Sequence, residues 1–196
     1  MKSMIKKILF AVIFFQVVAS CGFTPTLKLA DQGQTRSKIY YEIENSSYKA
    51  HETLRDLFQD YGGVGEEFNL SQPYLLVSQH SVTTEYNDSR YQIEETLKAL
   101  DELKLPTIML WPNADAGGDD ISKGIRTYRE KNNPTWLHLF KNLPTHIYIH
   151  LMNTTVCLVG NSSSGIREGA FIGTPVVNIG TRQNKRLRAE NVIQAP

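Results

Sequence analysis

The stretch Gly160–Arg182, GNSSSGIREGAFIGTPVVNIGTR, contains the pattern that decides the fold. An apolar strand over Val156–Val159 precedes it, and a turn of small polar residues, 161–165, follows that strand. A helix is predicted to begin at Ile166 and to end at a Gly-Thr-Pro sequence, because glycine and proline both interrupt helices. Val176 then opens a second buried strand. A strand, a turn, a helix and a strand in this order form the repeating unit of a parallel sheet.

The residues before this stretch repeat the same alternation. Their strands are continuous apolar runs, which are typical of parallel strands covered by helices on both faces. The sequence therefore predicts an α/β fold with a Rossmann-like parallel sheet, in which ligands bind beyond the carboxyl ends of the strands. The predicted strands span residues 74–79, 107–111 and 136–140, and the predicted helices span 48–61, 91–103, 119–131 and 145–152.

The turn over 161–165 has the chemistry of an anion-binding site. Ser162 and Ser163 supply hydroxyl groups, and the first N–H groups of the next helix lack intrahelical partners at its positive end. Glu168, about one turn into the predicted helix, is a carboxylate that can accept hydrogen bonds from two neighbouring sugar hydroxyls. A second interpretation is that the serine run only caps the helix, which is a frequent role of serine.

The same stretch closely resembles the C-terminal, nucleotide-binding half of the UDP-N-acetylglucosamine 2-epimerase family, and its hydrolysing branch in particular. The resemblance covers roughly residues 55–196. It implies one half of a two-domain, GT-B-type architecture with the active site in the cleft between the halves. Family members are often homo-oligomers, and we expect no cofactor. Four sequence blocks occur in the family's order: Tyr61–Gly65 (YGGVG), Val77–Tyr86 (VSQHSVTTEY), Trp111–Gly117 (WPNADAG) and Gly160–Arg182.

The resemblance also implies roles for individual residues. His80, which ends the predicted strand 74–79, matches the histidine beside the diphosphate, so we expect it to be catalytic as the leaving group departs. The alternative for His80 is a strand-end histidine that hydrogen-bonds a backbone carbonyl. Asp115 is expected either near the ligand or as the cap of the helix over 119–131. The residues expected to bind UDP are Asn113, Ser162, Ser163, Glu168 and Arg182, the last because a forked guanidinium suits a diphosphate.

The first residues carry the pattern of a targeting segment. Three lysines precede an apolar run over 8–18, and Ala19-Ser20-Cys21 follows, as in a secretory signal or the lipobox of a bacterial lipoprotein. The resemblance instead implies the cytoplasm, where the nucleotide sugar is found, so membrane attachment is expected only if Cys21 is lipidated. We predict three segments: 1–21 as a signal, a lipoprotein-like segment or a remnant, 22–47 as a linker or a poorly defined segment, and 48–196 as a truncated, Rossmann-like nucleotide-sugar-binding domain.

Composition narrows the remaining classes of function. Charged residues make up 21% of the chain and the formal net charge is +1, so no general attraction to nucleic acid is expected. The two cysteines form no framework and no His/Cys spacing fits zinc, so we expect no metal site. Neither a GxGxxG nor a GxxxxGK[ST] sequence is present, which argues against a dinucleotide or P-loop site.

The resemblance implies a hydrolysing UDP-N-acetylglucosamine 2-epimerase, which forms N-acetylmannosamine and UDP for sialic acid biosynthesis. That reaction needs a base that removes the C2 proton and a site that stabilises the departing diphosphate. Residues 1–55 contain neither the family's acidic C2 residues nor its basic loop, so we expect a fragment that lacks the catalytic N-terminal domain and is inactive alone. Two alternatives remain open: a GT-B glycosyltransferase, and a non-catalytic UDP-binding remnant or lipoprotein.

Overall fold

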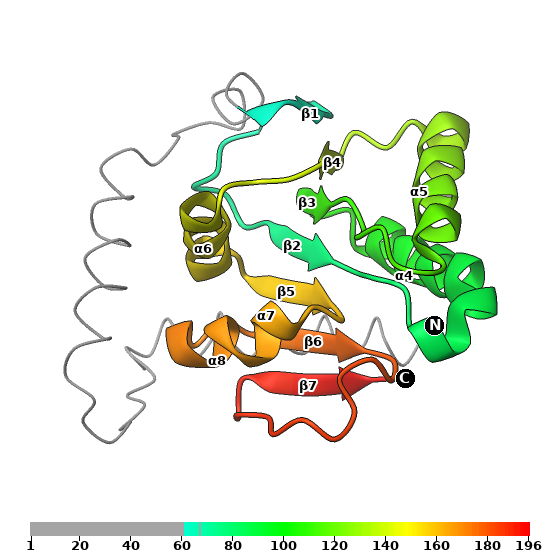
Figure 1. Cartoon of the computed structure of the whole chain (residues 1–196). Helices are drawn as coiled ribbons and strands as arrows, with labels where there is room; N and C mark the ends of the chain where they lie inside the picture. The colour runs from blue at the N-terminus through cyan, green and yellow to red at the C-terminus, as the bar shows by residue number, and fades with distance from the viewer. Residues whose placement is uncertain (1–60, 67) are drawn as a thin grey trace.

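The computed structural model describes residues 61–66 and 68–196, which form a mixed sheet with helices on both faces (Figure 1). The strand order is β1-β4-β3-β2-β5-β6-β7, and every pairing is parallel except that of β1 with β4. The predicted α/β class is confirmed. The strands are β1 (Gly63–Val64), β2 (Leu75–Ser78), β3 (Thr107–Leu110), β4 (Leu137–Phe140), β5 (Cys157–Gly160), β6 (Val176–Ile179) and β7 (Val192–Ala195).

The helices alternate with the central strands, and the helices predicted over 91–103, 119–131 and 145–152 are present. The signal segment with Cys21, the linker and the helix predicted from residue 48 fall on residues 1–60, outside the described part of the chain. Within residues 61–66 and 68–196, every helix is too short or too polar to cross a bilayer. The helices are η1 (Thr83–Asp88), α4 (Ser89–Leu103), α5 (Gly118–Asn132), α6 (Thr145–Thr154), α7 (Ser163–Ile166) and α8 (Glu168–Ile172).

Successive side chains of the central strands enter two separate apolar layers, because side chains alternate between the faces of a strand. Leu75 and Val77 of β2 pack in the layer that includes Ile93 of α4 and Ile121 of α5. Leu76 packs in the opposite layer, which includes residues of α6. Every residue of β2 is buried. This two-sided burial explains why the strand reads as a continuous apolar run.

The helix expected from Ile166 differs from the observed structure. α7 begins earlier, at Ser163, since the Ser162 hydroxyl caps it. Arg167, with φ −92° and ψ −73°, then separates α7 from α8. Gly173 ends α8 in the left-handed conformation, with φ 87°, as the Gly-Thr-Pro sequence predicts.

The sequence pattern does not predict β1 and β7, the strands at the two edges of the sheet. β1 is two residues long and antiparallel to β4, which is too short for any periodic signal. Most residues of β7 are only partly buried, and the strand lacks the continuous burial of the central ones. Both edges therefore depend on pairing with an existing strand rather than on a strong local pattern.

β2 and β5 lie side by side at the centre of the sheet, and the winding of the chain reverses between them (Figure 1). β2, β3 and β4 proceed toward one edge, whereas β5, β6 and β7 proceed toward the other. Ligands of open parallel sheets bind at such a switch point, beyond the carboxyl ends of the strands. Ser78 and Gly160 form the last residue pair of β2 and β5 at this end.

The ends of these two strands approach each other very closely. Gly160 has a φ of +140°, and a Cβ atom added to it would lie 2.1 Å from the carbonyl oxygen of Ser78. A side chain at this position would therefore meet backbone that cannot move without displacing β2. Glycine is required here for both its conformation and its lack of a Cβ atom.

Gly160→Ala is expected to lower the free energy of unfolding by about 3 kcal/mol or more, because positive-φ strain adds to a backbone clash. Urea denaturation would measure the change. Gly180→Ala is the matched control. Gly180 also has a positive φ, 66°, but nothing lies within 4 Å of an added Cβ atom. We expect a loss of about 1 kcal/mol there from strain alone. Equal losses at both positions would contradict the importance of the close approach.

Candidate functional site

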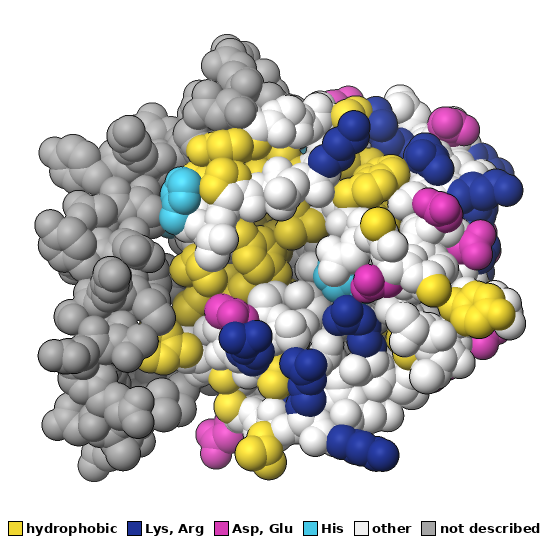
Figure 2. All heavy atoms as spheres, in the orientation of Figure 1, with side chains coloured by type: hydrophobic (Ala, Val, Ile, Leu, Met, Phe, Trp, Pro, Cys, Tyr) yellow, Lys and Arg dark blue, Asp and Glu magenta, His cyan; other side chains and the backbone are white. Residues whose placement is uncertain are grey.

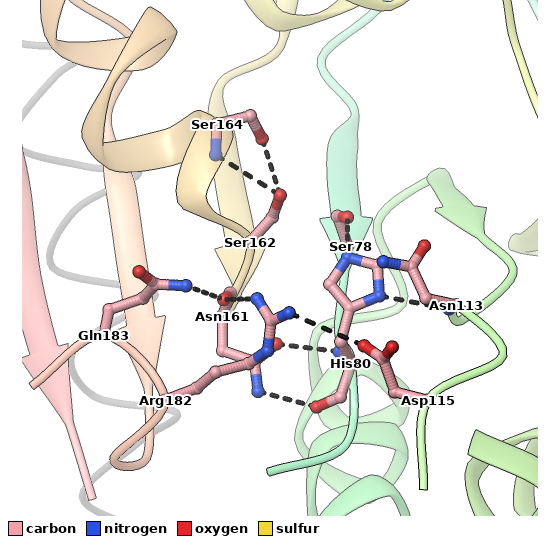
Figure 3. Close-up of polar contacts among 9 residues, drawn as sticks. All are labelled: Ser78, His80, Asn113, Asp115, Asn161, Ser162, Ser164, Arg182 and Gln183. Carbon is pink, nitrogen blue, oxygen red and sulfur yellow. Dashed lines mark hydrogen bonds and ion pairs between the residues drawn. The ribbon is translucent and has the colours of Figure 1, made fainter. Parts of the chain in front are cut away.

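The carboxyl ends of the central strands bring together most of the predicted site residues (Figure 3). His80 follows β2, Asn113 follows β3, Ser162 follows β5 and Arg182 follows β6. In Figure 2 a histidine, an acidic and a basic side chain adjoin one another at the surface, where the ends of β2 and β5 lie in Figure 1. The topology of the sheet therefore collects these side chains from separate loops into one place.

His80 is held through both its backbone and its ring. Its backbone N–H donates to Asn161 Oδ1 (2.7 Å), and its carbonyl oxygen accepts from Asn161 Nδ2 (2.8 Å). The backbone N–H of Asn113 donates to His80 Nδ1 (3.2 Å), so the proton of the neutral ring lies on Nε2, which is 3.3 Å from Ser78 Oγ. Among the described residues, the ring thus bonds to an N–H and a hydroxyl, and not to the backbone carbonyl of the alternative interpretation.

The pKa of His80 lies below its usual value. Burial lowers this pKa most, the Arg182 guanidinium lowers it further, and the Asp115 carboxylate acts in the opposite direction. At pH 7 the ring is therefore neutral and presents an Nε2–H donor rather than a positive charge. A neutral donor can hydrogen-bond an anionic oxygen without first gaining a proton.

Arg182 is partly buried and shared between two partners. Its Nη1 donates to the carbonyl oxygen of Asn161 (3.3 Å), and its Nη2 lies 3.8 Å from Asp115 Oδ2.

Asp115 does not cap α5, so one of the two predictions for this residue is wrong. Gly117 is the N-cap residue with φ 85°, and no side chain caps the helix. The backbone carbonyl of Asp115 instead accepts from Gly118 N–H (2.8 Å), and its side chain is directed to Arg182.

The serine turn combines a helix cap with an uncommitted hydroxyl. Ser162 Oγ accepts from the backbone N–H of Ser164 (3.3 Å), which confirms the capping interpretation for Ser162. Ser164 Oγ lies 2.8 Å from Tyr148 Oη. Ser163 is partly buried, and its hydroxyl has no hydrogen-bond partner among the described residues. α7 is only four residues long, so the helix dipole contributes less here than a continuous helix would.

Glu168 lies at the start of α8 and not inside a continuous helix. Its side chain is 40% exposed, and Oε1 lies 3.9 Å from Arg167 Nη2. Within the described part of the chain, no hydrogen bond joins Glu168 to the other predicted site residues. The structure therefore leaves this carboxylate accessible, and its contact with ribose stays a prediction.

The sequence analysis assigns no role to Asn161 and Gln183, which the structure places at the centre of the site. Asn161 is 2% exposed and contacts both His80 and Arg182. Gln183 is 1% exposed, and its Nε2 donates to the carbonyl oxygen of Asn161 (2.8 Å). A polar residue directly after a buried strand is a signal that could have identified Asn161. Gln183 lies in a polar stretch that carries no comparable signal.

The chemistry available to a ligand here is electrostatic. Among the described residues, no group of His, Cys, Asp and Glu side chains could hold a metal ion. Arg182 supplies a permanent positive charge, and the His80 Nε2–H and the Ser163 hydroxyl supply hydrogen-bond donors. Fixed donors and a guanidinium of this kind stabilise negative charge that develops on a leaving group.

A parallel sheet that presents such donors at its switch point is the architecture of a Rossmann-like domain for an anionic ligand. The chain belongs to the UDP-N-acetylglucosamine 2-epimerase family, whose model matches residues 24–196. The match begins well before residue 55, from which the sequence blocks indicate the resemblance. The similarity to the family therefore extends into the segment predicted as a linker.

Three curated relatives support this assignment. The chain is 37% identical over 130 residues to the GDP/UDP-N,N'-diacetylbacillosamine 2-epimerase (hydrolyzing) of Campylobacter jejuni, covering 66% of this chain and 34% of the relative. It is 34% identical over 142 residues to the UDP-N,N'-diacetylbacillosamine 2-epimerase (hydrolyzing) of Legionella pneumophila, covering 72% and 36%. It is 25% identical over 170 residues to the UDP-N-acetylglucosamine 2-epimerase of Neisseria meningitidis, covering 85% and 42%.

The chain thus spans between 34% and 42% of the length of these relatives. Each of the three is named as a 2-epimerase. Together with the family match, they support the epimerase hypothesis over the glycosyltransferase alternative.

We expect Arg182→Ala to raise the pKa of His80 and Asp115→Asn to lower it. The guanidinium disfavours a positively charged ring, whereas the carboxylate favours one. An NMR titration of the His80 Cε1–H signal would measure both changes against the wild-type midpoint. Arg186→Ala, which removes an exposed arginine, is the control and should leave the midpoint unchanged. Shifts in the reverse directions would contradict the arrangement of charges around the ring.

Proposed function

We propose that this chain supplies the nucleotide half of a hydrolysing UDP-N-acetylglucosamine 2-epimerase, which converts UDP-N-acetylglucosamine to N-acetylmannosamine and UDP. The observation that carries the proposal is the meeting of the His80 ring, Asn113 and the Arg182 guanidinium at the switch point of a sheet whose chain belongs to this family. Those three residues follow three different strands, so the folded sheet brings them together.

In this proposal the described residues act on the leaving group. When the bond between C1 of the sugar and the phosphate oxygen breaks, negative charge develops on the diphosphate. Arg182 offers a permanent charge to it, and His80 offers its Nε2–H, which would exchange the 3.3 Å bond to Ser78 Oγ for a bond to a phosphate oxygen. Asn161 and Asn113 hold His80 in place before the ligand arrives, so the change that this step needs at the ring is an exchange of one hydrogen-bond partner.

The nucleoside is assigned to the neighbouring serine turn and α8. The Glu168 carboxylate is accessible, and it would accept hydrogen bonds from the two ribose hydroxyls. Ser163, the first residue of α7, has a hydroxyl without a hydrogen-bond partner among the described residues, and this hydroxyl would donate to the phosphate region. Ser162 contributes by holding the turn in shape through its cap to Ser164.

Removal of the C2 proton is assigned to the other half of the enzyme. The relatives are named for sugars that differ, N,N'-diacetylbacillosamine in two and N-acetylglucosamine in the third. The site residues proposed here contact the nucleotide, which all these substrates share. UDP-N,N'-diacetylbacillosamine is therefore the competing substrate, and turnover assays of the complete enzyme would include both sugars.

UDP is expected to bind the purified chain with a dissociation constant between about 10 µM and 1 mM, since half of a binding cleft gives modest affinity. Isothermal titration calorimetry would measure it. Arg182→Ala is expected to weaken UDP binding by about 10- to 100-fold, the range for a lost hydrogen bond to a charged group. Uridine, which lacks the diphosphate, should bind wild type and Arg182→Ala equally.

Arg186→Ala is the matched control for this measurement, because Arg186 is an exposed arginine in the same loop. It should bind UDP as wild type does. An absence of UDP binding by a folded sample, or equal losses from both arginine variants, would contradict the proposed function.

The chain alone is not expected to release N-acetylmannosamine from UDP-N-acetylglucosamine, because the proposal assigns the base to the other half. A coupled assay for free UDP would test this, with one of the longer relatives as the positive control. Addition of a separately produced N-terminal half of such a relative is the complementary experiment. Turnover by the purified chain alone would contradict this division of roles.

A further inference from the structure

One buried side chain connects the parts of the site without being expected to touch the ligand. Asn161, the residue after β5, is 2% exposed, and all of its polar groups have partners. Its backbone N–H donates to the carbonyl oxygen of Ser78 (3.1 Å). Its carbonyl oxygen accepts from Gln183 (2.8 Å) and Arg182 (3.3 Å), and its side-chain amide bonds twice to His80.

The two bonds to His80 extend the pairing of the central strands. The regular pairing of β2 with β5 ends at Ser78 and Gly160. Beyond that point the backbone N–H and C=O of His80 are buried, and buried backbone groups need partners. The side-chain amide of Asn161 supplies both an acceptor (2.7 Å) and a donor (2.8 Å), as a peptide group of a neighbouring strand would.

Only an amide satisfies both requirements at this position. An aspartate has two acceptors at neutral pH, so one carboxylate oxygen would face the carbonyl oxygen of His80. An alanine would leave the two His80 backbone groups without partners. Asn161 therefore fixes the path of the backbone at His80, and that path places the ring where Nδ1 receives the Asn113 N–H (3.2 Å).

We propose that Asn161 is a positioning residue of the nucleotide site, whose side chain sets the orientation of the His80 imidazole while its carbonyl group sets that of the Arg182 guanidinium (Figure 3). The identity of the ligand in this inference rests on the proposed function. The effect on the geometry of His80 does not, so it is measured separately.

The test compares Asn161→Ala with Asn178→Ala. Asn178 is 1% exposed, lies beside Gly160 in β6 and donates its side-chain amide to Gln194 (2.8 Å), so it matches Asn161 in type, burial and place in the sheet. NMR would follow two signals: the titration of His80 Cε1–H, and the backbone amide of Asn113, which reports its bond to Nδ1. Calorimetry would give the affinity for UDP.

Asn161→Ala is expected to move the pKa of His80 toward its ordinary value, because a released ring is less buried. It should also shift the Asn113 amide signal and weaken UDP binding at least 10-fold. Asn178→Ala is expected to leave all three unchanged, even where it lowers the melting temperature to the same extent. Unchanged His80 and Asn113 signals in Asn161→Ala, or the same changes in Asn178→Ala, would overturn the proposal.

Two provisions keep the test decisive. Where wild type binds no UDP, the proposed function fails, but the two NMR signals still decide the role of Asn161. If the Asn161→Ala variant does not fold, amide hydrogen exchange measured on the wild-type protein takes the place of the measurements on that variant. The side-chain amide protons of Asn161 and the backbone amide of His80 should then exchange slowly, and exchange at the rate of a solvent-exposed amide would overturn the proposal.

Discussion

The close contact between the ends of β2 and β5 is the constraint on which the rest of the site depends. Gly160 has no side chain, so its backbone can pass within a distance of the Ser78 carbonyl that any Cβ atom would obstruct. This approach brings the next residue, Asn161, within hydrogen-bonding distance of His80. A side chain at Gly160 would therefore disturb the site without taking part in it, because the backbone approach positions the Asn161 amide and that amide positions His80.

The charges around His80 decide what the ring can do. Arg182 is close enough to lower the pKa of the imidazole, and Asp115 offsets only part of that effect. The site consequently holds one permanent positive charge and one neutral donor, and it avoids two adjacent cations. Such an arrangement suits the diphosphate of the proposed function, since a second fixed cation would hold that product more tightly.

The central part of the fold was predictable because strands that are buried on both faces of a sheet appear in the sequence as continuous apolar runs. β2 and β5 are buried throughout and begin with apolar residues, and polar residues that mark the site follow them. The position of Asn161 after a buried strand marks it as a site residue, but its bonds to His80 were not predictable, because an amide that satisfies two backbone groups has the same sequence appearance as a turn residue. The interruption of the helix at Arg167 was not predictable either. It is a change in backbone dihedral angles within a segment whose composition is typical of a helix.

The serine turn shows why capping and ligand binding are not competing interpretations. A cap needs one hydroxyl, and Ser162 supplies it to the N–H of Ser164. The hydroxyl of Ser164 is in turn occupied by Tyr148. Among the described residues, the hydroxyl of Ser163 is therefore the one of the three without a hydrogen-bond partner, and it lies where α7 begins. Three consecutive serines are thus consistent with two that hold the turn and one that is offered to the ligand, which a shorter serine run would not provide.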